Sequence, residues 1–211
     1  MSTQIHGFFP GELQPSATVG GCINIYENVW PNPAQTIQTV ESICRDPENT
    51  IGWQKAPTLD RGINQIARTN YCCGITHFSK AENNAAFQNI HNQFHMLLLA
   101  ATVPYADRYK INEGFWHEQY DLLKYGPSQE YKDHYDGCTE IGRAISALVY
   151  LNDDFEGGEL EFCNFDVKIK PQAGMMVLFP SNFAYRHRSI PIIRGTKYAL
   201  VTWLRDRDTG Y

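Results

Sequence analysis

Apolar and polar residues follow different periods in the two halves of this 211-residue chain. In the first half, two stretches repeat apolar residues every three or four positions, as amphipathic helices do. In the second half, short runs rich in apolar and β-branched residues alternate with turn residues, which predicts strands. Because there is no repeat and no long linker, we expect one α+β domain over residues 1–211.

Two helices are predicted from their capping residues. Asn32 is a candidate N-cap followed by Pro33 at the first helical position, and this helix should end near Arg45. Its apolar face is predicted to hold Ile37, Val40, Ile43 and Cys44. The segment Ser79-Lys80-Ala81-Glu82 is a capping box that opens a second helix to about Ala101. Its predicted core-facing residues are Phe87, Ile90, Phe94, Leu97 and Leu98.

Strands are predicted between these helices, within residues 65–78, and throughout the chain after residue 117. The later strands span Glu118–Tyr125, Ala144–Asn152, Glu159–Phe162, Asp166–Lys170, Met175–Phe179, Tyr185–Arg194 and Lys197–Arg205. Such short strands, without helices between them, predict an antiparallel sandwich or a jelly roll over about 118–205. The helical half, about 1–117, would then pack on one face of the larger sheet.

The composition is that of an ordinary globular protein, with 43% hydrophobic and 19% charged residues. A net charge of −5 argues against nucleic-acid binding, which usually leaves a basic footprint. We expect no secretory signal and no membrane span, because no suitable apolar run is present. The six cysteines contain no C-x-x-C pair, so we expect reduced thiols, several of them buried, in a cytoplasmic protein. Disulfides in a secreted protein are the alternative.

Candidate chemistry begins at His134-Tyr135-Asp136. On a strand, residues two apart point to the same side, so this imidazole and this carboxylate can reach one metal ion. His187 on a later strand is the natural third ligand. Two histidines and one carboxylate leave three coordination positions open, as in non-haem Fe(II) oxygenases. Taken alone, His134 or Asp136 is equally explained by a turn or a surface ion pair.

Lys197 lies ten residues after His187, just past a turn at Gly195. A cation at this position can reach the distal carboxylate of a 2-oxoglutarate that chelates the iron through its other end. The alternative is a solvated lysine at a strand end, which is the usual environment of lysine.

The stretch from Tyr125 to Arg205 resembles the catalytic core of the prolyl 4-hydroxylase-like 2-oxoglutarate/Fe(II) dioxygenases. Its first segment is similar to the family pattern Y-x-x-G-Q-x-Y-x-x-H-x-D, with the glycine displaced, and its last to H-x-x-x-P-V-x-x-G-x-K-W…W. The segments that carry the resemblance are Tyr125–Asp136, Ala147–Asn152, Glu156–Glu159, Lys170–Phe179 and His187–Trp203.

The resemblance implies a double-stranded β-helix (jelly-roll) core with N-terminal helices packed on the major sheet. It implies that the metal ligands are His134, Asp136 and His187. Lys197 and Tyr125 would bind 2-oxoglutarate, with Ser146 near the same site. Leu160 stands where the family often has a threonine that helps to hold this cosubstrate.

Three further residues align with positions that lie toward the peptide substrate in relatives: Tyr131, Arg143 and Trp203. Each also has a structural interpretation, the aromatics as core or rim residues and Arg143 as an ion-pair partner. Aromatic residues in 48–65 and 104–118 either line a substrate groove or pack against the barrel. They are Trp53, Tyr105, Tyr109 and Trp116.

The implied reaction is hydroxylation of a C–H bond, coupled to oxidative decarboxylation of 2-oxoglutarate to succinate and CO2. It needs Fe(II) and O2, with ascorbate as the expected reductant. A peptide or protein substrate is expected, and a proline-containing one is favoured. The alternatives are a nucleobase, free amino acid or other small molecule as substrate, or a non-catalytic jelly-roll binding module. The nucleobase-repair branch usually uses arginine for the distal carboxylate, so Lys197 argues against it, although Arg194 is nearby.

Overall fold

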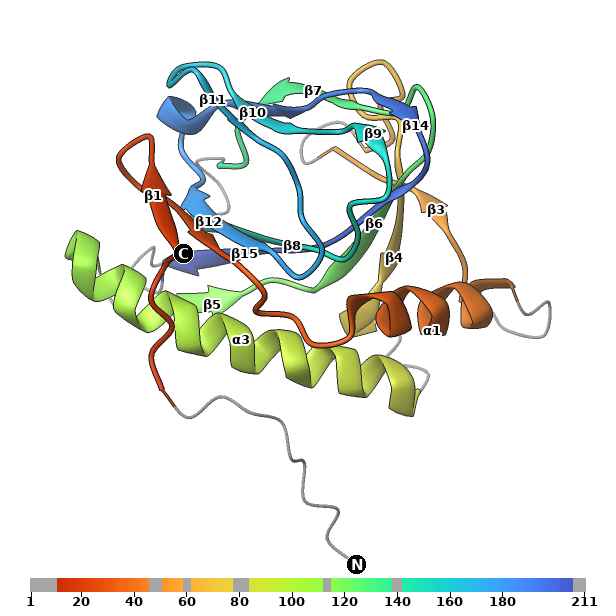
Figure 1. Cartoon of the computed structure of the whole chain (residues 1–211), viewed down its shortest axis with the longest axis horizontal. Helices are drawn as coiled ribbons and strands as arrows, with labels where there is room; N and C mark the ends of the chain where they lie inside the picture. The colour runs from red at the N-terminus through yellow and green to blue at the C-terminus, as the bar shows by residue number, and fades with distance from the viewer. Residues whose placement is uncertain are drawn as a thin grey trace, which may run out of the picture.

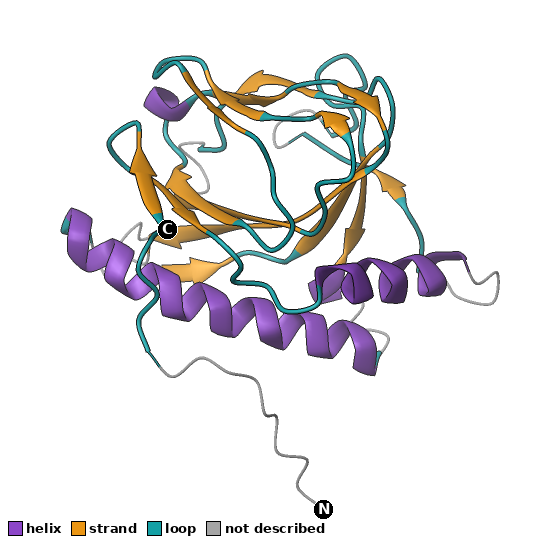
Figure 2. Ribbon diagram, in the orientation of Figure 1, coloured by secondary structure: helices purple, strands orange, loops and turns teal. Residues whose placement is uncertain are grey.

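The structure is a computed structural model that describes residues 11–45, 51–58, 62–77, 84–111, 115–137 and 142–206. Two sheets face each other across the barrel-like half of the molecule (Figure 1). Helices α1 (Pro33–Arg45) and α3 (Ala85–Tyr109) lie along the outer side of the larger sheet (Figures 1 and 2). Among the described residues, no helix is long and apolar enough to cross a membrane.

The described strands form a nine-stranded major sheet and a smaller layer opposite it. The major sheet runs in the order β1 (Ala17–Val19), β2 (Ile23–Tyr26), β12 (Met176–Pro180), β8 (Arg143–Tyr150), β15 (Lys197–Asp206), β6 (Asp121–Tyr125), β4 (Tyr71–Gly74) and β3 (Gln54–Lys55), with β5 (Phe115–His117) paired to β15. The smaller layer holds β11 (Val167–Ile169), β10 (Leu160–Phe162), β13 (His187–Ser189) and β7 (Tyr131–His134), and the pair β14 (Ile192–Arg194) and β9 (Glu156–Gly157).

From β6 to β15 the chain passes repeatedly between the two layers, which is the winding of a double-stranded β-helix. The pairings within each layer are antiparallel. The jelly-roll prediction is therefore confirmed. Because side chains alternate across a strand, the central strands of the major sheet contribute to two separate cores.

Strand β8 shows this alternation. Ile145, Ala147 and Val149 join the core beneath the sheet, which also contains Phe87, Phe94 and Leu97 of α3. Tyr150 points the other way, into a core inside the barrel. The helices thus cover the outer face of the major sheet, and the inner face is left for the cavity between the sheets.

Helix α1 has the predicted limits, and its predicted apolar residues all contact the core, with Val40 fully buried. Helix α3 buries all five of its predicted core residues. The capping box predicted at 79–82 lies outside the described residues. In the described chain the N-cap is Asn84, whose Oδ1 accepts hydrogen bonds from the backbone N–H groups of Ala86 and Phe87 at 3.0 and 3.1 Å.

The predicted end of this helix near Ala101 is wrong, because α3 continues to Tyr109. Pro104 lies inside the helix and has no N–H to donate to the carbonyl of Ala100. The backbone N–H of Leu13 donates to that carbonyl instead, at 2.9 Å. A partner distant in sequence therefore satisfies the carbonyl that proline leaves without a donor, and no local pattern predicts this contact.

Most predicted strands of the second half are present, but the one expected over Tyr185–Arg194 is split. It consists of a short 3₁₀ helix, η1 (Phe183–Tyr185), followed by β13 and β14, with Pro191 between the two strands. Strands β1 and β2 were not predicted, because runs of three and four residues are too short to reveal a period. Of the described cysteines only Cys73 is buried, which corrects the expectation of several, and none forms a disulfide.

Candidate metal and cosubstrate site

The three predicted metal ligands come together at one end of the smaller layer. His134 is the last residue of β7, and the β7–β13 register places His187 directly opposite it. Asp136 lies just beyond the end of β7, so the prediction that it shares a strand with His134 is wrong. Its carboxylate nevertheless lies beside the Nε2 atoms of both rings. Asp136 Oδ1 lies 3.5 Å from His134 Nε2, and Oδ2 lies 3.6 Å from His187 Nε2.

Backbone carbonyls orient both imidazoles. His134 Nδ1 lies 2.7 Å from the carbonyl oxygen of Lys132, and His187 Nδ1 lies 3.0 Å from that of Tyr185. A carbonyl can only accept, so each Nδ1 donates to it and each Nε2 is left to face the cluster. The rings of Phe162 and Phe179 pack against His187 with centroids 5.6 and 4.8 Å away, which further limits its rotation.

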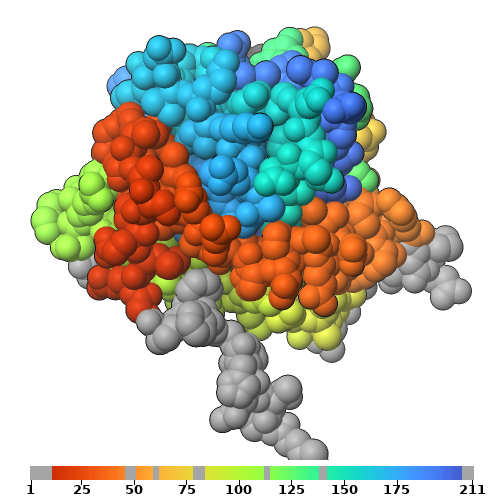
Figure 3. All heavy atoms as spheres, in the orientation of Figure 1, coloured from red at the N-terminus to blue at the C-terminus, as the bar shows by residue number. Residues whose placement is uncertain are grey.

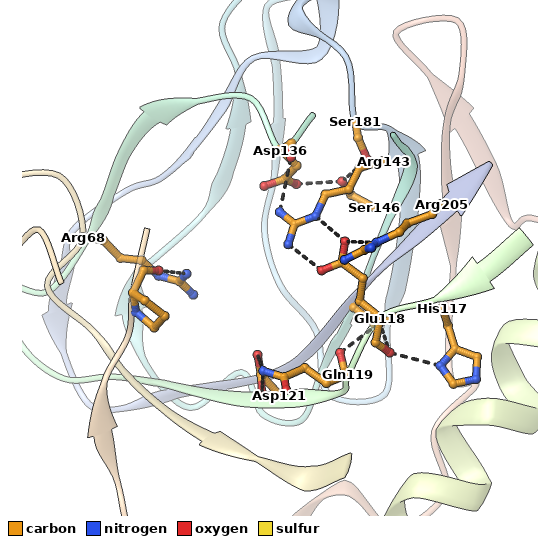
Figure 4. Close-up of polar contacts among 12 residues, drawn as sticks. Arg68, His117, Glu118, Gln119, Asp121, Asp136, Arg143, Ser146, Ser181 and Arg205 are labelled. Carbon is orange, nitrogen blue, oxygen red and sulfur yellow. Dashed lines mark hydrogen bonds and ion pairs between the residues drawn. The ribbon is translucent and has the colours of Figure 1, made fainter. Parts of the chain in front are cut away.

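Asp136 is ionised in this environment. Burial alone would raise its pKa, but His187, His134 and a hydrogen bond from Ser146 together hold the pKa well below the usual aspartate range. Ser146 Oγ donates to Asp136 Oδ2 at 2.6 Å and lies 2.8 Å from Ser181 Oγ (Figure 4). Ser146 therefore supports a candidate metal ligand, and its contact with the cosubstrate stays a prediction.

The donor set fits Fe(II). Burial, with the neighbouring His134, lowers the pKa of His187 to about 4, so its imidazole is neutral and able to bind a metal at neutral pH. The ligand atoms of the three residues all lie within 4.8 Å of one another. Within the described chain they are the only group of three or more such side chains this close. Two imidazoles and one carboxylate leave room for further ligands on the metal.

A cavity extends from this cluster between the two sheets. Its walls combine aromatic and aliphatic side chains with a few polar groups. They are Arg68, Leu123, Tyr125, Tyr131, His134, Asp136, Leu148, Tyr150, Leu160, His187, Ser189, Lys197, Ala199, Val201 and Trp203. Such a lining suits a small ligand held by a few convergent polar groups.

Lys197 is buried in the wall of this cavity, with 3% of its surface exposed. Its Nζ donates to the carbonyl of Gly158 at 2.8 Å and to Ser189 Oγ at 2.5 Å. Among the described residues no carboxylate pairs with it. Burial lowers its pKa from 10.5 to about 7, against a smaller opposing effect of Glu159. A buried ammonium without an anion is unfavourable, so the site is suited to an anionic ligand.

Tyr125 lies at the same end of the cavity. It is opposite Lys197 in the β6–β15 register, and Lys197 Nζ is 4.5 Å from the centroid of its ring. Arg194, the other cation considered for the cosubstrate, is 79% exposed and pairs with Glu156. It is not among the residues that line the cavity.

The predicted substrate residues have different environments. Tyr131 and Trp203 line the cavity, and the Tyr131 ring stacks on His134 with centroids 3.5 Å apart. Trp203 Nε1 is buried and has no hydrogen-bond partner in the described part of the chain. Arg143 is not a lining residue; its guanidinium lies 3.8 Å from the Trp203 ring centroid. It also donates to Glu118 at 2.8 and 2.6 Å and to the backbone carbonyl of Asp136 at 3.2 Å (Figure 4).

Sequence reasoning missed two polar residues of the cavity. Ser189 follows His187 by two positions on β13, so strand alternation already predicts that both face the same way. Arg68 comes from the segment between β3 and β4, and only the tertiary fold brings it over the Tyr131 ring, at 4.7 Å. The aromatics proposed for a groove, Trp53, Tyr105, Tyr109 and Trp116, are not among the lining residues.

Residues 120–205 match the sequence model of the family described as the 2OG-Fe(II) oxygenase superfamily. Over 120 residues the chain is 33% identical to "Probable prolyl 4-hydroxylase 9" of Arabidopsis thaliana, covering 43% of this chain and 42% of that protein. Over 172 residues it is 24% identical to procollagen-lysine,2-oxoglutarate 5-dioxygenase 1 of Homo sapiens, covering 77% of this chain and 20% of that protein. The chain thus spans less than half the length of these curated relatives.

Two solved structures share the fold. A Trichoplax adhaerens prolyl hydroxylase, in complex with a peptide fragment of hypoxia inducible factor, superposes with a TM-score of 0.70 at 18% identity, covering 88% of this chain and 84% of that one. A Pseudomonas putida prolyl-4-hydroxylase superposes with a TM-score of 0.62 at 22% identity, covering 88% of this chain and 93% of that one. At these identities the likeness supports the fold alone. The match of residues 120–205 to the superfamily model and the similarity to a prolyl 4-hydroxylase agree with the resemblance predicted from the sequence.

Proposed function

We infer that this chain is a hydroxylase that uses Fe(II), 2-oxoglutarate and O2 to hydroxylate a C–H bond in a peptide or protein. One observation supports this most: a cluster of two histidines and one carboxylate shares a cavity with a buried lysine that has no acidic partner in the described chain. The cluster suits a divalent metal, and the lysine suits the far carboxylate of a dicarboxylic acid bound to that metal.

Each residue has a distinct task in this proposal. His134, Asp136 and His187 hold Fe(II), and Lys197 and Tyr125 receive the distal carboxylate of 2-oxoglutarate. When bound, the metal and cosubstrate supply the oxidising chemistry, in which 2-oxoglutarate becomes succinate and CO2. The chain contributes ligand geometry, orientation and a cavity that limits access of water.

The substrate side of the proposal rests on Tyr131 and Trp203. Both line the cavity that holds the ligand cluster, and their rings offer apolar surface to an extended peptide. Arg143, held by Glu118, fixes the Trp203 ring from the other side. We favour a proline-containing substrate because relatives are named as prolyl hydroxylases, and ascorbate as the reductant on the same resemblance.

The test is conversion of 2-oxoglutarate to succinate by the Fe(II)-loaded protein, with O2 and ascorbate present and proline-rich peptides added in turn. The wild type should form succinate slowly alone and faster with a substrate peptide. His134→Ala should abolish turnover at every 2-oxoglutarate concentration. Lys197→Ala should recover part of its turnover when 2-oxoglutarate is raised.

Mass spectrometry of the stimulating peptide should then show one added oxygen per succinate formed. A wild-type protein that forms no succinate and binds neither Fe(II) nor 2-oxoglutarate in calorimetry would contradict the proposal. The non-catalytic jelly-roll binding module would then be the better interpretation.

A further inference from the structure

Two cysteines meet where helix α1 packs on the outer face of the major sheet. Cys44 lies near the end of α1 and Cys73 lies on β4, and their Sγ atoms are 3.8 Å apart. Cys73 is buried in the core beneath the sheet, whereas Cys44 is partly buried and packs against the same core. Both are free thiols, and the proposed hydroxylation uses neither of them.

The cysteine next to Cys73 in sequence faces the other way. Successive residues of a strand point to opposite faces of the sheet. Cys72 packs with Leu123 and Tyr125 on the inner face, whereas Cys73 packs with Leu122 on the outer face. Of the two adjacent cysteines, it is therefore Cys73 that meets α1.

A buried carboxylate ties this part of α1 to the sheet. Glu41 lies three residues before Cys44, on the same side of the helix. Its Oε1 accepts hydrogen bonds from Lys124 Nζ at 2.6 Å and from the Tyr198 hydroxyl at 2.7 Å. The contact between the two sulfur atoms thus belongs to an interface that polar groups of β6 and β15 hold together.

The two thiols differ in accessibility and in acidity. Cys44 is the more accessible, and its contact with the Cys73 thiol lowers its pKa against the opposing effect of burial. A lower pKa favours the thiolate, which is the reactive form of cysteine. The contact with Cys44 and burial both raise the pKa of Cys73, so this thiol stays protonated. Cys44 is therefore suited to react first, with Cys73 beside it.

We propose that Cys44 and Cys73 form an oxidative modification site, at which a peroxide converts the two thiols to a disulfide that links α1 to β4. The Cys44 thiolate attacks one oxygen of hydrogen peroxide, and the O–O bond breaks to give a sulfenic acid and hydroxide. The Cys73 sulfur then attacks the Cys44 sulfur, and the S–S bond forms as the sulfenic hydroxyl leaves with the Cys73 proton as water. In sum, two thiols are oxidised to one disulfide and one peroxide is reduced to two waters.

The sulfur atoms need only a short displacement for this reaction, because they are already in contact and a disulfide holds them about 2.05 Å apart. The inference goes beyond the proposed hydroxylase function and does not depend on it.

The experiment is treatment of the folded full chain with a small excess of hydrogen peroxide, with Mn(II) in place of Fe(II) so that the peroxide meets no iron. Free thiols are then alkylated, and the peptides are mapped by mass spectrometry without reduction. Wild type should give one linked peptide that contains Cys44 and Cys73, which dithiothreitol separates. The melting temperature should rise by about 5–10 °C on oxidation and return on reduction, because a disulfide restricts the unfolded chain.

Three variants serve as controls. Cys44→Ser should abolish both the link and the rise in melting temperature. Cys72→Ser removes a thiol of the inner face, and Cys163→Ser removes an exposed thiol that follows β10 in the other layer. Both should form the link as wild type does.

Three results would overturn the proposal. The first is that Cys44 and Cys73 both remain open to alkylation while the exposed Cys163 is oxidised. The second is that either of the pair becomes linked to another cysteine, in the same chain or in a second one. The third is that the linked protein melts at a lower temperature than the reduced protein, since the bond would then oppose the native packing of α1.

Discussion

The two ends of the cavity are built on opposite electrostatic principles. At the cluster end, the Asp136 carboxylate accepts a hydrogen bond from Ser146 and lies 3.5 and 3.6 Å from the Nε2 atoms of His134 and His187. At the other end, Lys197 is equally buried but has only a carbonyl and a hydroxyl as partners. The pKa values of the two groups differ accordingly. The pKa of Asp136 is held below the usual aspartate range, which favours its charged form, whereas burial lowers the pKa of Lys197 to about 7, which disfavours its charged form.

This difference shows what each end is suited to bind. A carboxylate and two imidazoles whose ligand atoms lie within 4.8 Å of one another suit a cation. An ammonium destabilised by burial gains its counter-charge only when a ligand supplies it. One cavity with both ends suits a molecule that chelates a metal at one end and carries a carboxylate at the other, as 2-oxoglutarate does.

The cluster end should be the most sensitive to mutation. Asp136→Ala removes the carboxylate beside the two imidazoles, and metal affinity should fall by more than about a hundredfold, beyond the usual effect of losing an outer-shell partner. Isothermal calorimetry with Mn(II) measures this directly. Asp133→Ala is the control: it removes an exposed carboxylate of β7 that pairs with Arg186, and it should retain metal binding.

A mutation at the lysine end should weaken cosubstrate binding rather than metal binding. Lys197→Met keeps much of the side-chain volume but removes the charge, and the Kd for 2-oxoglutarate should rise by about 10- to 100-fold, the cost of losing a charged hydrogen bond. Metal affinity should not change. A loss of metal binding in this variant would show that the two ends are not independent.

Protonation of Lys197 gives a pH prediction. Its pKa is about 7 in the folded chain and 10.5 ordinarily, so between these values the unfolded state binds one more proton than the folded state. The free energy of unfolding without ligand should therefore rise with pH through this window, by up to about 1.4 kcal/mol per pH unit. Denaturant unfolding at several pH values should show the slope in wild type and its reduction in Lys197→Met. Equal slopes would mean that Lys197 is not responsible.

The smallest effect is expected from the support of the cluster. Ser146→Ala removes the hydroxyl that donates to Asp136 Oδ2 at 2.6 Å. Metal affinity should fall by about tenfold, in the range typical of outer-shell partners. Mn(II) calorimetry of this variant beside Asp136→Ala compares the two effects. An effect on 2-oxoglutarate affinity at saturating metal would instead support the original expectation that Ser146 lies beside the cosubstrate.

Much of this comparison could be predicted from the sequence, because its signals are local. Short apolar and β-branched runs separated by turn residues after residue 117 predict the barrel strands. The spacing of His134, Asp136, His187 and Lys197 brings the candidate ligands into consideration together. Residues two apart on a strand share a face whether or not the fold is known; this holds for His187 and Ser189 on β13 but not for His134 and Asp136, because β7 ends at His134.

The features that could not be predicted depend on tertiary contacts, which no local sequence pattern indicates. The extension of α3 past Pro104 requires the N–H of Leu13, about ninety residues away in sequence. Ser146 was expected beside the cosubstrate, but the path of the chain after β7 brings Asp136 to it. Arg143 aligned with substrate-binding positions, yet it lies behind Trp203 because Glu118 from a distant segment pairs with it. Each of these partners is set by the closure of the barrel.

The most direct test of the account is a crossed binding experiment. Mn(II) and 2-oxoglutarate would each be titrated anaerobically into wild type, Asp136→Ala and Lys197→Met. We expect Asp136→Ala to lose the metal and, with it, tight 2-oxoglutarate binding. Lys197→Met should bind Mn(II) as wild type does but 2-oxoglutarate weakly. If Lys197→Met instead bound 2-oxoglutarate with wild-type affinity, the assignment of the two ends would be contradicted.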